Sequence, residues 1–512
     1  MSEFYKDKYD AIVVGGALSG MACALTLLKK GKSVLILERH NLPGGVTTSF
    51  VRGGVEMEAT LHEMMSIGPE DQPLKIRTFF DDFGIKINWL RVPEAFSLVV
   101  PKEKIDITIH AGYETAAREI DAQYKGTYAE VLRLFNLCDT VYDSVNVLSV
   151  TPMSKLKMLI HHEAFVKTCG YSTDEVLDTF RLPQEVKDIL KAYWIYVGSP
   201  TSDLPFTIYA VLMADYIKGG SYVSKDFSYE MSVKMAEKCV EMGAQIEYCQ
   251  NVEKILVKDN HVYGVKTGRG DEILSDFVAC SAYPNKCFGS MIEPKSEVPS
   301  AALKSVNARK IGLTCFSVVM LLDKEPKELG IRDYSLFSSE SDMNLDNFWA
   351  GLATKGPYDY LTTICLNYSN PTAVPKGMTS LSITTLPRPQ AFYVVKPEDY
   401  YSMKNKIAKK MIDQVSRHVG VNLLDHIVQI EIETPMTVAR YTGDYNGCVY
   451  GYQHSMDDHI VARLQMSEEE NYIKGLSFCG AHAISGDGMS PQITNGRKAA
   501  KTLLDQMEKE AR

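Results

Sequence analysis

One stretch near the N-terminus, residues 9–45, limits most strongly what this chain can fold into. It reads YDAIVVGGALSGMACALTLLKKGKSVLILERHNLPGG. Residues 11–14 and 33–37 are short apolar runs, which are typical of buried parallel strands. Residues 21–30 have helical character and end before Gly31, a suitable helix C-cap. The order of strand, glycine turn, helix and strand predicts a βαβ unit that binds a dinucleotide.

The turn GGALSG has the composition that a pyrophosphate site needs. Backbone N–H groups at a helix N-terminus bind phosphate when the side chains are small enough to allow close approach. Ala17 stands in the middle glycine position of the usual motif, and Glu38 ends the second strand, where a carboxylate can accept hydrogen bonds from ribose hydroxyls. A glycine-rich turn without a ligand is the alternative. The predicted contacts here are Gly15, Gly16, Ala17, Leu18, Ser19, Gly20 and Glu38.

Bulk composition excludes several classes of protein. A net charge of −9 argues against nucleic acid as a partner, because phosphate-binding surfaces are basic. The eleven cysteines include no CxxC pair, which favours reduced thiols in a cytoplasmic protein over a disulfide framework. The charged N-terminus does not resemble a signal peptide, and no apolar run approaches the ~20 residues of a transmembrane helix. His161 and His162 lack a plausible set of further metal ligands, so no metal site is predicted.

The α/β pattern is interrupted twice along the chain, so we expect an α/β fold that is discontinuous in sequence. Residues 1–95, 215–295 and 471–512 are predicted to form the dinucleotide-binding domain. Residues 96–214 are largely helical, and residues 296–470 alternate as an antiparallel sheet with an added helix. These two segments are predicted to form an inserted α+β substrate domain.

The residues that follow Glu38 carry a specific resemblance. Arg39, a second glycine pair at Gly44 and Gly45, and Thr47-Thr48 are similar to the extended fingerprint of the FAD-binding amine oxidase and phytoene desaturase superfamily. The resemblance implies a GR2-type flavoprotein with a Rossmann-like FAD-binding domain. It also implies FAD contacts at Arg39, Gly44, Gly45, Val46 and Thr47, although Val46 stands where a basic residue is common.

Three further segments extend the resemblance to the phytoene desaturase, carotenoid isomerase and retinol saturase-like branch. Residues 219–267 are similar to the middle of these proteins, where Val252 would contact the adenine. Residues 434–452 and 475–503 are similar to two C-terminal segments. Ser490 is a suitable helix N-cap before Pro491, and a helix N-terminus there would stabilise negative charge on a reduced flavin. The implied FAD contacts are Gly480, Ala481, Asp487, Gly488, Met489 and Ser490.

Candidate catalytic groups are His62, Glu63 and His482. Residues 55–65 align with the family segment beside the isoalloxazine, where a titratable group can move protons, and the resemblance also places His482 near the flavin. The alternative for both histidines is a buried structural role. Tyr450 and Tyr452 are candidates for the substrate cavity, with core packing as the default.

The resemblance implies desaturation, saturation or redox-neutral isomerisation of carbon–carbon bonds in a long hydrophobic substrate, such as a carotenoid, retinoid, isoprenoid or unsaturated fatty acid. Two alternatives are an FAD-dependent amine oxidase and a non-catalytic prenyl-lipid carrier like the GDP-dissociation inhibitors. Residues 149–168 mix apolar and Lys side chains, which suits either peripheral contact with a membrane or an ordinary domain helix. The sequence leaves the oligomeric state open.

Overall fold

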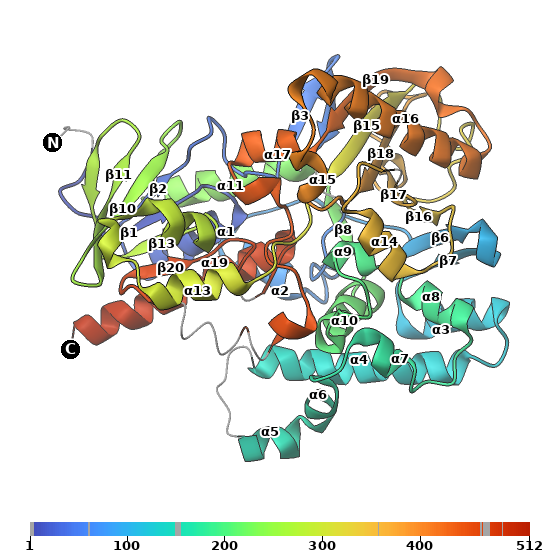
Figure 1. The fold of residues 1–512 in the computed structure, drawn as a ribbon, viewed down its shortest axis with the longest axis horizontal. Coiled ribbons are helices and arrows are strands. Elements are labelled where there is room, and N and C mark those ends of the chain that lie inside the picture. The colour runs from blue at the N-terminus through green and yellow to red at the C-terminus, as the bar shows by residue number, and fades with distance from the viewer. Residues whose placement is uncertain are drawn as a thin grey trace.

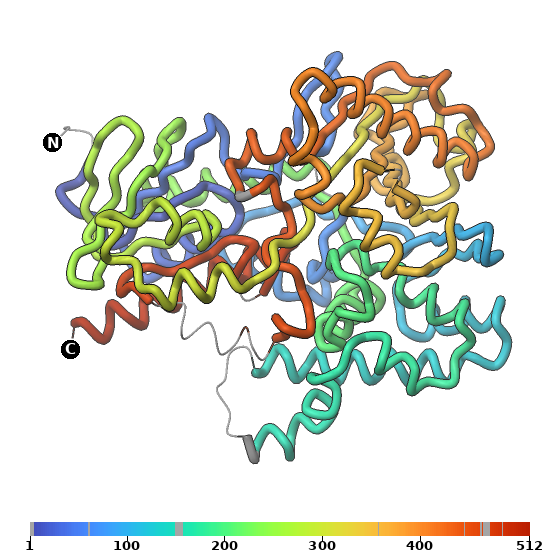
Figure 2. The backbone as a smooth tube through the Cα atoms, viewed as in Figure 1, coloured from blue at the N-terminus to red at the C-terminus, as the bar shows by residue number. Residues whose placement is uncertain are grey.

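The computed structural model describes residues 5–59, 62–148, 155–356, 358–460, 463, 472–483 and 485–511. Two lobes lie side by side, one around β1 and α1 and the other around β15 to β19 with a group of helices below it (Figure 1). The chain passes between the lobes several times, so segments of very different colour lie together in each lobe (Figure 2). All eleven cysteines are free thiols.

A five-stranded sheet forms the centre of the first lobe, in the order β20-β13-β1-β2-β9 with parallel pairing throughout. Alternate side chains of these short apolar strands enter two different cores, so both faces of the sheet are covered. Helices α1, α11 and α19 lie on one face. The bounds are β1 (Ala11–Val14), β2 (Val34–Leu37), β9 (Gln245–Glu247), β13 (Val278–Cys280), β20 (Leu476–Phe478), α1 (Leu18–Leu28), α11 (Phe227–Glu241) and α19 (Met489–Glu510).

A smaller sheet in the order β12-β11-β10-β14 covers the other face of the first lobe. Its central hairpin, β10 with β11, is antiparallel, as the alternation of residues 252–267 predicts. The bounds are β10 (Val252–Lys258), β11 (His261–Thr267), β12 (Glu272–Leu274), β14 (Ile292–Glu293), α12 (Pro284–Lys286) and α13 (Ser300–Ala308).

The second lobe contains a seven-stranded sheet in the order β19-β15-β18-β17-β16-β6-β7. Its neighbours are antiparallel except β16 and β6, which are parallel. The bounds are β6 (Phe96–Val100), β7 (Ile105–Ile109), β15 (Phe316–Leu322), β16 (Ser335–Ser339), β17 (Tyr360–Cys365), β18 (Thr379–Thr385), β19 (Ile427–Glu433), α14 (Leu345–Gly351), α15 (Gln390–Tyr393), α16 (Tyr400–Val419) and α17 (Pro435–Thr442).

The helices between residues 113 and 218 pack under this sheet and share its apolar core. A stacked pair of rings, Phe96 and Phe337, joins two of its strands, and Tyr193 meets both rings edge-on from the helical side. The bounds are α3 (Tyr113–Gln123), α4 (Tyr128–Leu148), α5 (Lys155–His161), α6 (Glu163–Thr168), α7 (Thr173–Leu177), α8 (Gln184–Leu190), α9 (Trp194–Val197), α10 (Phe206–Met213) and a π-helical turn at Ala214–Lys218.

Short elements connect the lobes. The bounds are β3 (Ser49–Arg52), β4 (Val55–Glu58), α2 (Lys75–Asp82), β5 (Trp89–Arg91) and β8 (Tyr222–Ser224). Glu58 at the end of β4 accepts hydrogen bonds from the N–H (2.6 Å) and hydroxyl (2.6 Å) of Ser228 on α11. This carboxyl therefore fixes β4 to the helix of the first lobe.

The predicted fold class is confirmed: a Rossmann-like α/β unit is combined with a second region of mixed sheet and helix. The residue limits proposed for the domains stay a prediction. Within the segment suggested for membrane contact, residues 149–154 lie outside the described residues. Helix α5 exposes Leu159 (54%) and Ile160 (65%), whereas α6 packs inward through Phe165. Among the helices that the structure describes, none is long and apolar enough to cross a membrane.

Candidate functional site

A cleft lies where the parallel strands of the first lobe end and face the sheet of the second lobe. Val14, Leu37, Ser281 and Gly480, which stand at or just after the ends of four parallel strands, all line it. Ligands of open α/β sheets bind in this crevice beyond the carboxyl ends of the strands. The cleft has a volume of about 330 Å³, within the range of roughly 300–1,000 Å³ for ligand sites.

The first glycine turn is shaped by contacts that permit no side chain. Gly15 follows β1 with a φ of +102°, and a Cβ atom there would lie 2.0 Å from the Ser281 hydroxyl. A Cβ atom on Gly20 would lie 2.0 Å from the Gly15 carbonyl oxygen. Helix α1 then begins at Leu18 after Ala17, which makes no side-chain cap, so the first N–H groups of the helix stay available beside the cleft.

Glu38 links this turn to the residues after β2. Its carboxylate accepts hydrogen bonds from the N–H groups of Gly16 (2.6 Å) and His40 (2.7 Å). The Gly44 N–H donates to the Gly16 carbonyl (2.9 Å), and Gly44 pairs with Ala17 as an isolated bridge. The second glycine pair therefore folds back against the first, and the two turns form one wall of the cleft.

Two cations stand at the end of the cleft near Glu38. Arg39 donates to the carbonyls of Arg440 (3.0 Å) and Tyr441 (3.2 Å), and Lys286 donates to the carbonyl of Gly443 (3.2 Å). Val252, at the start of β10, lines this end as well. Sequence reasoning missed Lys286, which only the folding of α12 against the loop after α17 brings to the cleft.

The opposite end of the cleft is formed by the loop before α19. Gly480, Ala481, Asp487, Gly488 and Met489 all line it. Burial raises the pKa of Asp487 to about 8, so its carboxyl is neutral at neutral pH.

The prediction that Ser490 caps this helix is wrong. Helix α19 begins at Met489, and Gly488 is the N-cap, with a φ of +89° that favours glycine. The Ser490 hydroxyl instead donates to the Met65 carbonyl (2.7 Å), which ties the helix to the segment that carries His62 and Glu63. Ser490 lies behind the cleft wall.

Most of the predicted site residues converge on this one cleft. Its wall contains Gly15, Ala17, Leu18, Ser19, Glu38, Arg39, Gly44, Gly45, Val46, Thr47, His62, Glu63, Val252, Gly480, Ala481, His482, Asp487, Gly488 and Met489. Gly16, Gly20 and Ser490 are not part of the wall, and they support it through the contacts described above.

Glu63 is a buried carboxyl without a hydrogen bond partner. Its side chain is 6% exposed, and both carboxyl oxygens are unpaired within the described structure. Burial raises its pKa to about 8, and this rise is opposed by the nearby Tyr196 hydroxyl, although no hydrogen bond of acceptable geometry joins them. At neutral pH this carboxyl is a neutral hydrogen-bond and proton donor.

The two candidate histidines are neutral at neutral pH. Burial lowers the pKa of His62 to about 4 and that of His482 to about 3. The His62 ring meets the edge of Tyr196 at 6.2 Å, and its carbonyl accepts a hydrogen bond from Tyr334. Both ring nitrogens of His482 lack a partner among the described residues. A neutral imidazole can accept a proton or hold a polar group, but neither ring carries a positive charge.

Several tyrosines of the second lobe complete the cleft. Tyr196 on α9, Tyr216 on the π-helical turn and Tyr450 all line it. Only Tyr450 was a candidate from the sequence. Tyr452, the other tyrosine that the sequence suggested for the cavity, is fully buried outside the cleft. Its hydroxyl donates to Asn285 (2.6 Å). Tyr196 and Tyr216 belong to separate elements, so no local pattern could have placed them in one cavity.

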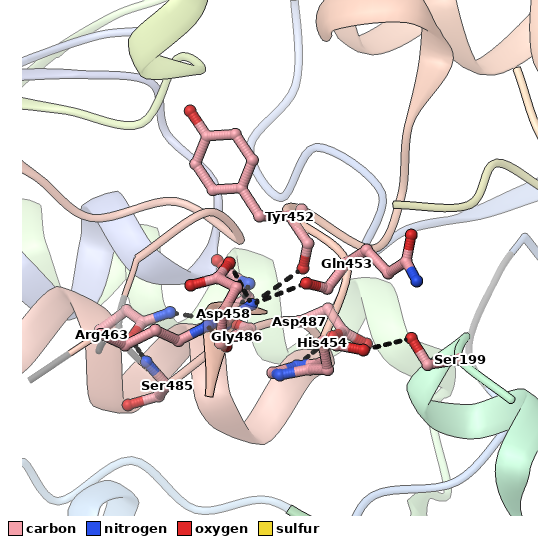
Figure 3. A network of polar contacts seen from close by, with 12 residues as sticks. Ser199, Tyr452, Gln453, His454, Asp458, Arg463, Ser485, Gly486 and Asp487 are labelled. Carbon is pink, nitrogen blue, oxygen red and sulfur yellow. Dashed lines mark hydrogen bonds and ion pairs between the residues drawn. The ribbon is translucent and has the colours of Figure 1, made fainter. Parts of the chain in front are cut away.

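A buried polar network lies behind the end of the cleft that the loop before α19 forms (Figure 3). His454 contacts Asp487 across 3.2 Å, and the Ser199 hydroxyl donates to the His454 carbonyl. Arg463 donates to the carbonyls of Tyr452 (3.1 Å) and Gln453 (3.3 Å), as Figure 3 shows. This network fixes the carboxyl of Asp487 against the second lobe.

Comparisons with known proteins agree with this architecture. A family model described as an NAD(P)-binding Rossmann-like domain matches residues 13–83. The chain is 23% identical to prolycopene isomerase 2, chloroplastic, of an Oncidium hybrid cultivar, over 94% of this chain and 81% of the relative. It is 22% identical to all-trans-retinol 13,14-reductase of Danio rerio, over 93% of this chain and 84% of the relative. A double mutant of putrescine oxidase has a similar fold, with a TM-score of 0.64 and 14% identity over 97% of this chain and 99% of that structure.

The two lobes and the cleft at the strand ends define a protein with a Rossmann-like dinucleotide-binding domain. Over most of its length the chain is similar to a prolycopene isomerase and to an all-trans-retinol 13,14-reductase, and its fold is similar to that of a putrescine oxidase. The resemblance seen in the sequence is thereby confirmed.

Proposed function

We propose that this protein binds FAD and changes the saturation or geometry of carbon–carbon double bonds in a long hydrophobic substrate. The observation that carries the proposal is the cleft itself. It continues from a dinucleotide-type glycine turn at Gly15 to the place where the neutral carboxyl of Glu63 faces Tyr196 of the second lobe. The names of the two relatives, an isomerase and a reductase, support a reaction at double bonds.

The residues present fit FAD. The N-terminus of α1 and the two glycine turns would hold the pyrophosphate, and Glu38 would accept hydrogen bonds from the ribose. Val252 would contact the adenine, and the N-terminus of α19 would face the flavin ring system. When bound, FAD supplies hydride transfer to or from carbon.

The chain's own groups would control the proton that accompanies this hydride. Glu63 holds a proton at neutral pH and is placed in the cleft wall to donate it or take it back. His62 and His482 are neutral rings that could receive a proton or position the substrate. The second lobe would shield the reacting carbons from water.

The first experiment measures flavin in the purified protein and in the supernatant after denaturation. Yellow protein that releases FAD is the expected result, whereas colourless protein would favour a lipid carrier. Anaerobic photoreduction followed by polyenes, unsaturated fatty acids and amines then separates the chemistry. Reoxidation by a polyene identifies a reductase, and a changed double-bond geometry without reoxidation identifies an isomerase. Reduction of the oxidised protein by an amine would contradict the proposal.

The role proposed for His62 has its own test. His62→Ala is expected to keep the flavin bound and to slow the step that reduces or reoxidises it, measured by stopped-flow absorbance. An unchanged rate would assign His62 to packing against Tyr196.

A further inference from the structure

The protein leaves several polar side chains of the cleft unsatisfied, and two of them, Glu63 and Tyr196, lie together. Both oxygens of Glu63 and the hydroxyl of Tyr196 are shielded from water and have no hydrogen bond partner in the described structure. The Tyr216 hydroxyl makes no hydrogen bond to a described residue either. Burial and the nearby Glu63 both raise the pKa of this hydroxyl. An unsatisfied buried polar group costs about 1–3 kcal/mol, so the two buried side chains Glu63 and Tyr196 at one place point to a ligand group that pairs with them.

Other polar groups of the same wall do not need a ligand. The hydroxyls of Ser317 and Thr384 hydrogen-bond each other (2.7 Å), and the Thr362 hydroxyl donates to the Thr384 carbonyl (3.2 Å). These residues of β15, β17 and β18 are therefore satisfied within the sheet. Unsatisfied polar atoms also occur on His40, Gln250 and His482 of the cleft wall. Glu63 and Tyr196 differ from these in lying together, where the Glu63 segment meets α9.

Glu63, Tyr196 and Tyr216 are all neutral donors. Burial raises the pKa of the Tyr196 and Tyr216 phenols well above the usual value, and Glu63 is protonated at neutral pH. Among the described residues that line the cleft, the only lysine or arginine side chains are Arg39 and Lys286, which bind backbone carbonyls at the Glu38 end. A carboxylate would find no cation beside Glu63, so the fitting ligand group is a neutral acceptor.

We propose that the substrate carries a carbonyl group conjugated with the reacting double bond, and that Glu63 and Tyr196 bind its oxygen as paired hydrogen-bond donors. This inference rests on the proposed function and specifies its substrate class. A pure hydrocarbon polyene would leave both donors unpaired in the complex, whereas an unsaturated aldehyde or ketone would satisfy them.

The same contact assists the reducing direction of the reaction. Hydride would add to the carbon β to the carbonyl; the FAD of the proposed function, when bound and reduced, would supply its two electrons and would be oxidised. The π pair of the carbon–carbon double bond shifts to form a double bond between the α carbon and the carbonyl carbon. The π pair of the carbonyl moves to its oxygen, and that oxygen takes the proton of Glu63. The enol then tautomerises to the saturated carbonyl compound, and Glu63 regains a proton from solvent.

The test compares two probes on the oxidised holoprotein. One is an all-trans C20 polyenal, and the other is the same polyene with a methyl group in place of the aldehyde. Their dissociation constants are measured by quenching of protein fluorescence, which requires no turnover. The wild type is expected to bind the aldehyde more tightly. Tyr196→Phe and Glu63→Leu should each reduce this preference by about 2- to 10-fold, the value of a neutral hydrogen bond.

Two matched variants separate this effect from a change in folding. Glu63→Gln keeps a neutral donor of the same shape, so it should retain the preference for the aldehyde that Glu63→Leu loses. Tyr368→Phe removes a hydroxyl that donates to the Ile331 carbonyl (2.7 Å) outside the cleft, and it should change neither affinity.

Equal affinity of the wild type for the two probes would overturn the inference, as would a Tyr196→Phe variant that weakens both equally. These results leave the proposed function intact if the hydrocarbon reoxidises the photoreduced protein. Absence of flavin, or reduction by an amine, would instead overturn the proposed function, and the ratio of probe affinities would still decide the carbonyl site.

Discussion

The carboxylate of Glu38 accepts hydrogen bonds from two different parts of the chain. One oxygen accepts from the Gly16 N–H and the other from the His40 N–H, so the side chain joins the glycine turn to the chain beyond β2. A ribose hydroxyl would use the lone pairs that remain on these oxygens. The residue therefore shapes the site, and in the proposed function it would also contact the cofactor.

Glu38→Gln should weaken FAD binding without unfolding the protein. An amide has only one acceptor oxygen, so one of the two N–H groups loses its partner at a cost of about 1–3 kcal/mol, or about 5- to 150-fold in the dissociation constant. The measurement is titration of the flavin-free protein with FAD, followed by flavin fluorescence. An unchanged dissociation constant would show that the carboxylate is dispensable.

The pKa of Glu63 predicts a pH dependence of stability. The carboxyl has an ordinary pKa of 4.5 when unfolded and about 8 when folded. Between these values the unfolded chain releases a proton that the folded chain retains, so stability is lost as pH rises, by up to about 1.4 kcal/mol per unit. Below pH 4.5 both states are protonated and the loss is absent.

Glu63→Gln removes this titration and keeps the shape of the side chain. The difference in melting temperature, variant minus wild type, should therefore increase as the pH is raised from 5 to 8.5. Scanning calorimetry of the flavin-free proteins measures it. The histidines are common to both proteins, so their titration cancels in the difference. A difference that does not change with pH would mean that Glu63 ionises freely in the folded state.

Residues of the site differed in how readily the sequence revealed them. Gly15 and Glu38 could be found because a βαβ unit places them by local spacing alone. Tyr196 and Tyr216 could not, because they reach the cleft only through the packing of α9 and the π-helical turn against the sheet. The two tyrosines show no helical or strand period that points to a ligand.

At the scale of elements, the crossing of α1 and α19 supports the glycine turn from behind. A Cβ atom on Gly496 of α19 would lie 2.1 Å from the Ser19 carbonyl and 2.9 Å from the Cβ of Ala22. The two helices approach this closely because the facing residues of α1 are small. The N-terminus of α1 is thereby held at the strand end where the pyrophosphate would bind.

Gly496→Val should separate these helices and displace the turn. We expect a lower melting temperature together with loss of flavin during gel filtration, because the packing of α19 on α1 both stabilises the core and positions the N-terminus of α1. Gly170→Ala is the matched control, since a Cβ atom at Gly170 meets no atom within 4 Å and the backbone φ is ordinary. Retention of flavin by Gly496→Val would show that α1 is positioned by the sheet alone.

The start of α19 shows how a good local signal can be overruled. Ser490 followed by Pro491 has the composition of a helix N-cap and first turn. In the structure Gly488 takes this place, because its positive φ lets the chain turn into the helix earlier. The Ser490 hydroxyl is then free to bond the Met65 carbonyl, a partner that is distant in sequence. Type and approximate position of the helix were predictable, but its cap was not.

At the scale of the whole molecule, a buried ion cluster joins the two lobes behind the cleft. Arg309, just after α13 of the first lobe, donates to both oxygens of Asp458, and Arg463 donates to one of them. The side chains of the two arginines are 7% and 1% exposed, and that of Asp458 is 10% exposed. Two buried guanidinium groups therefore share one carboxylate.

Asp458→Asn should destabilise the protein strongly, because both buried guanidinium groups would lose the carboxylate that they share. Loss of one partner of a buried ion pair costs about 3–5 kcal/mol. The neighbouring residue offers a control of the same chemistry: Asp457 pairs with Lys310 across 3.5 Å, with side chains 86% and 56% exposed. Exposed pairs contribute about 0–1 kcal/mol, so Asp457→Asn should be nearly neutral.

Urea unfolding monitored by both tryptophan fluorescence and flavin release would measure the two variants. Since Asp487 is held by His454 of the same segment, Asp458→Asn should release flavin at a lower urea concentration than wild type. Similar transitions for the two variants would mean that the cluster does not hold the lobes together.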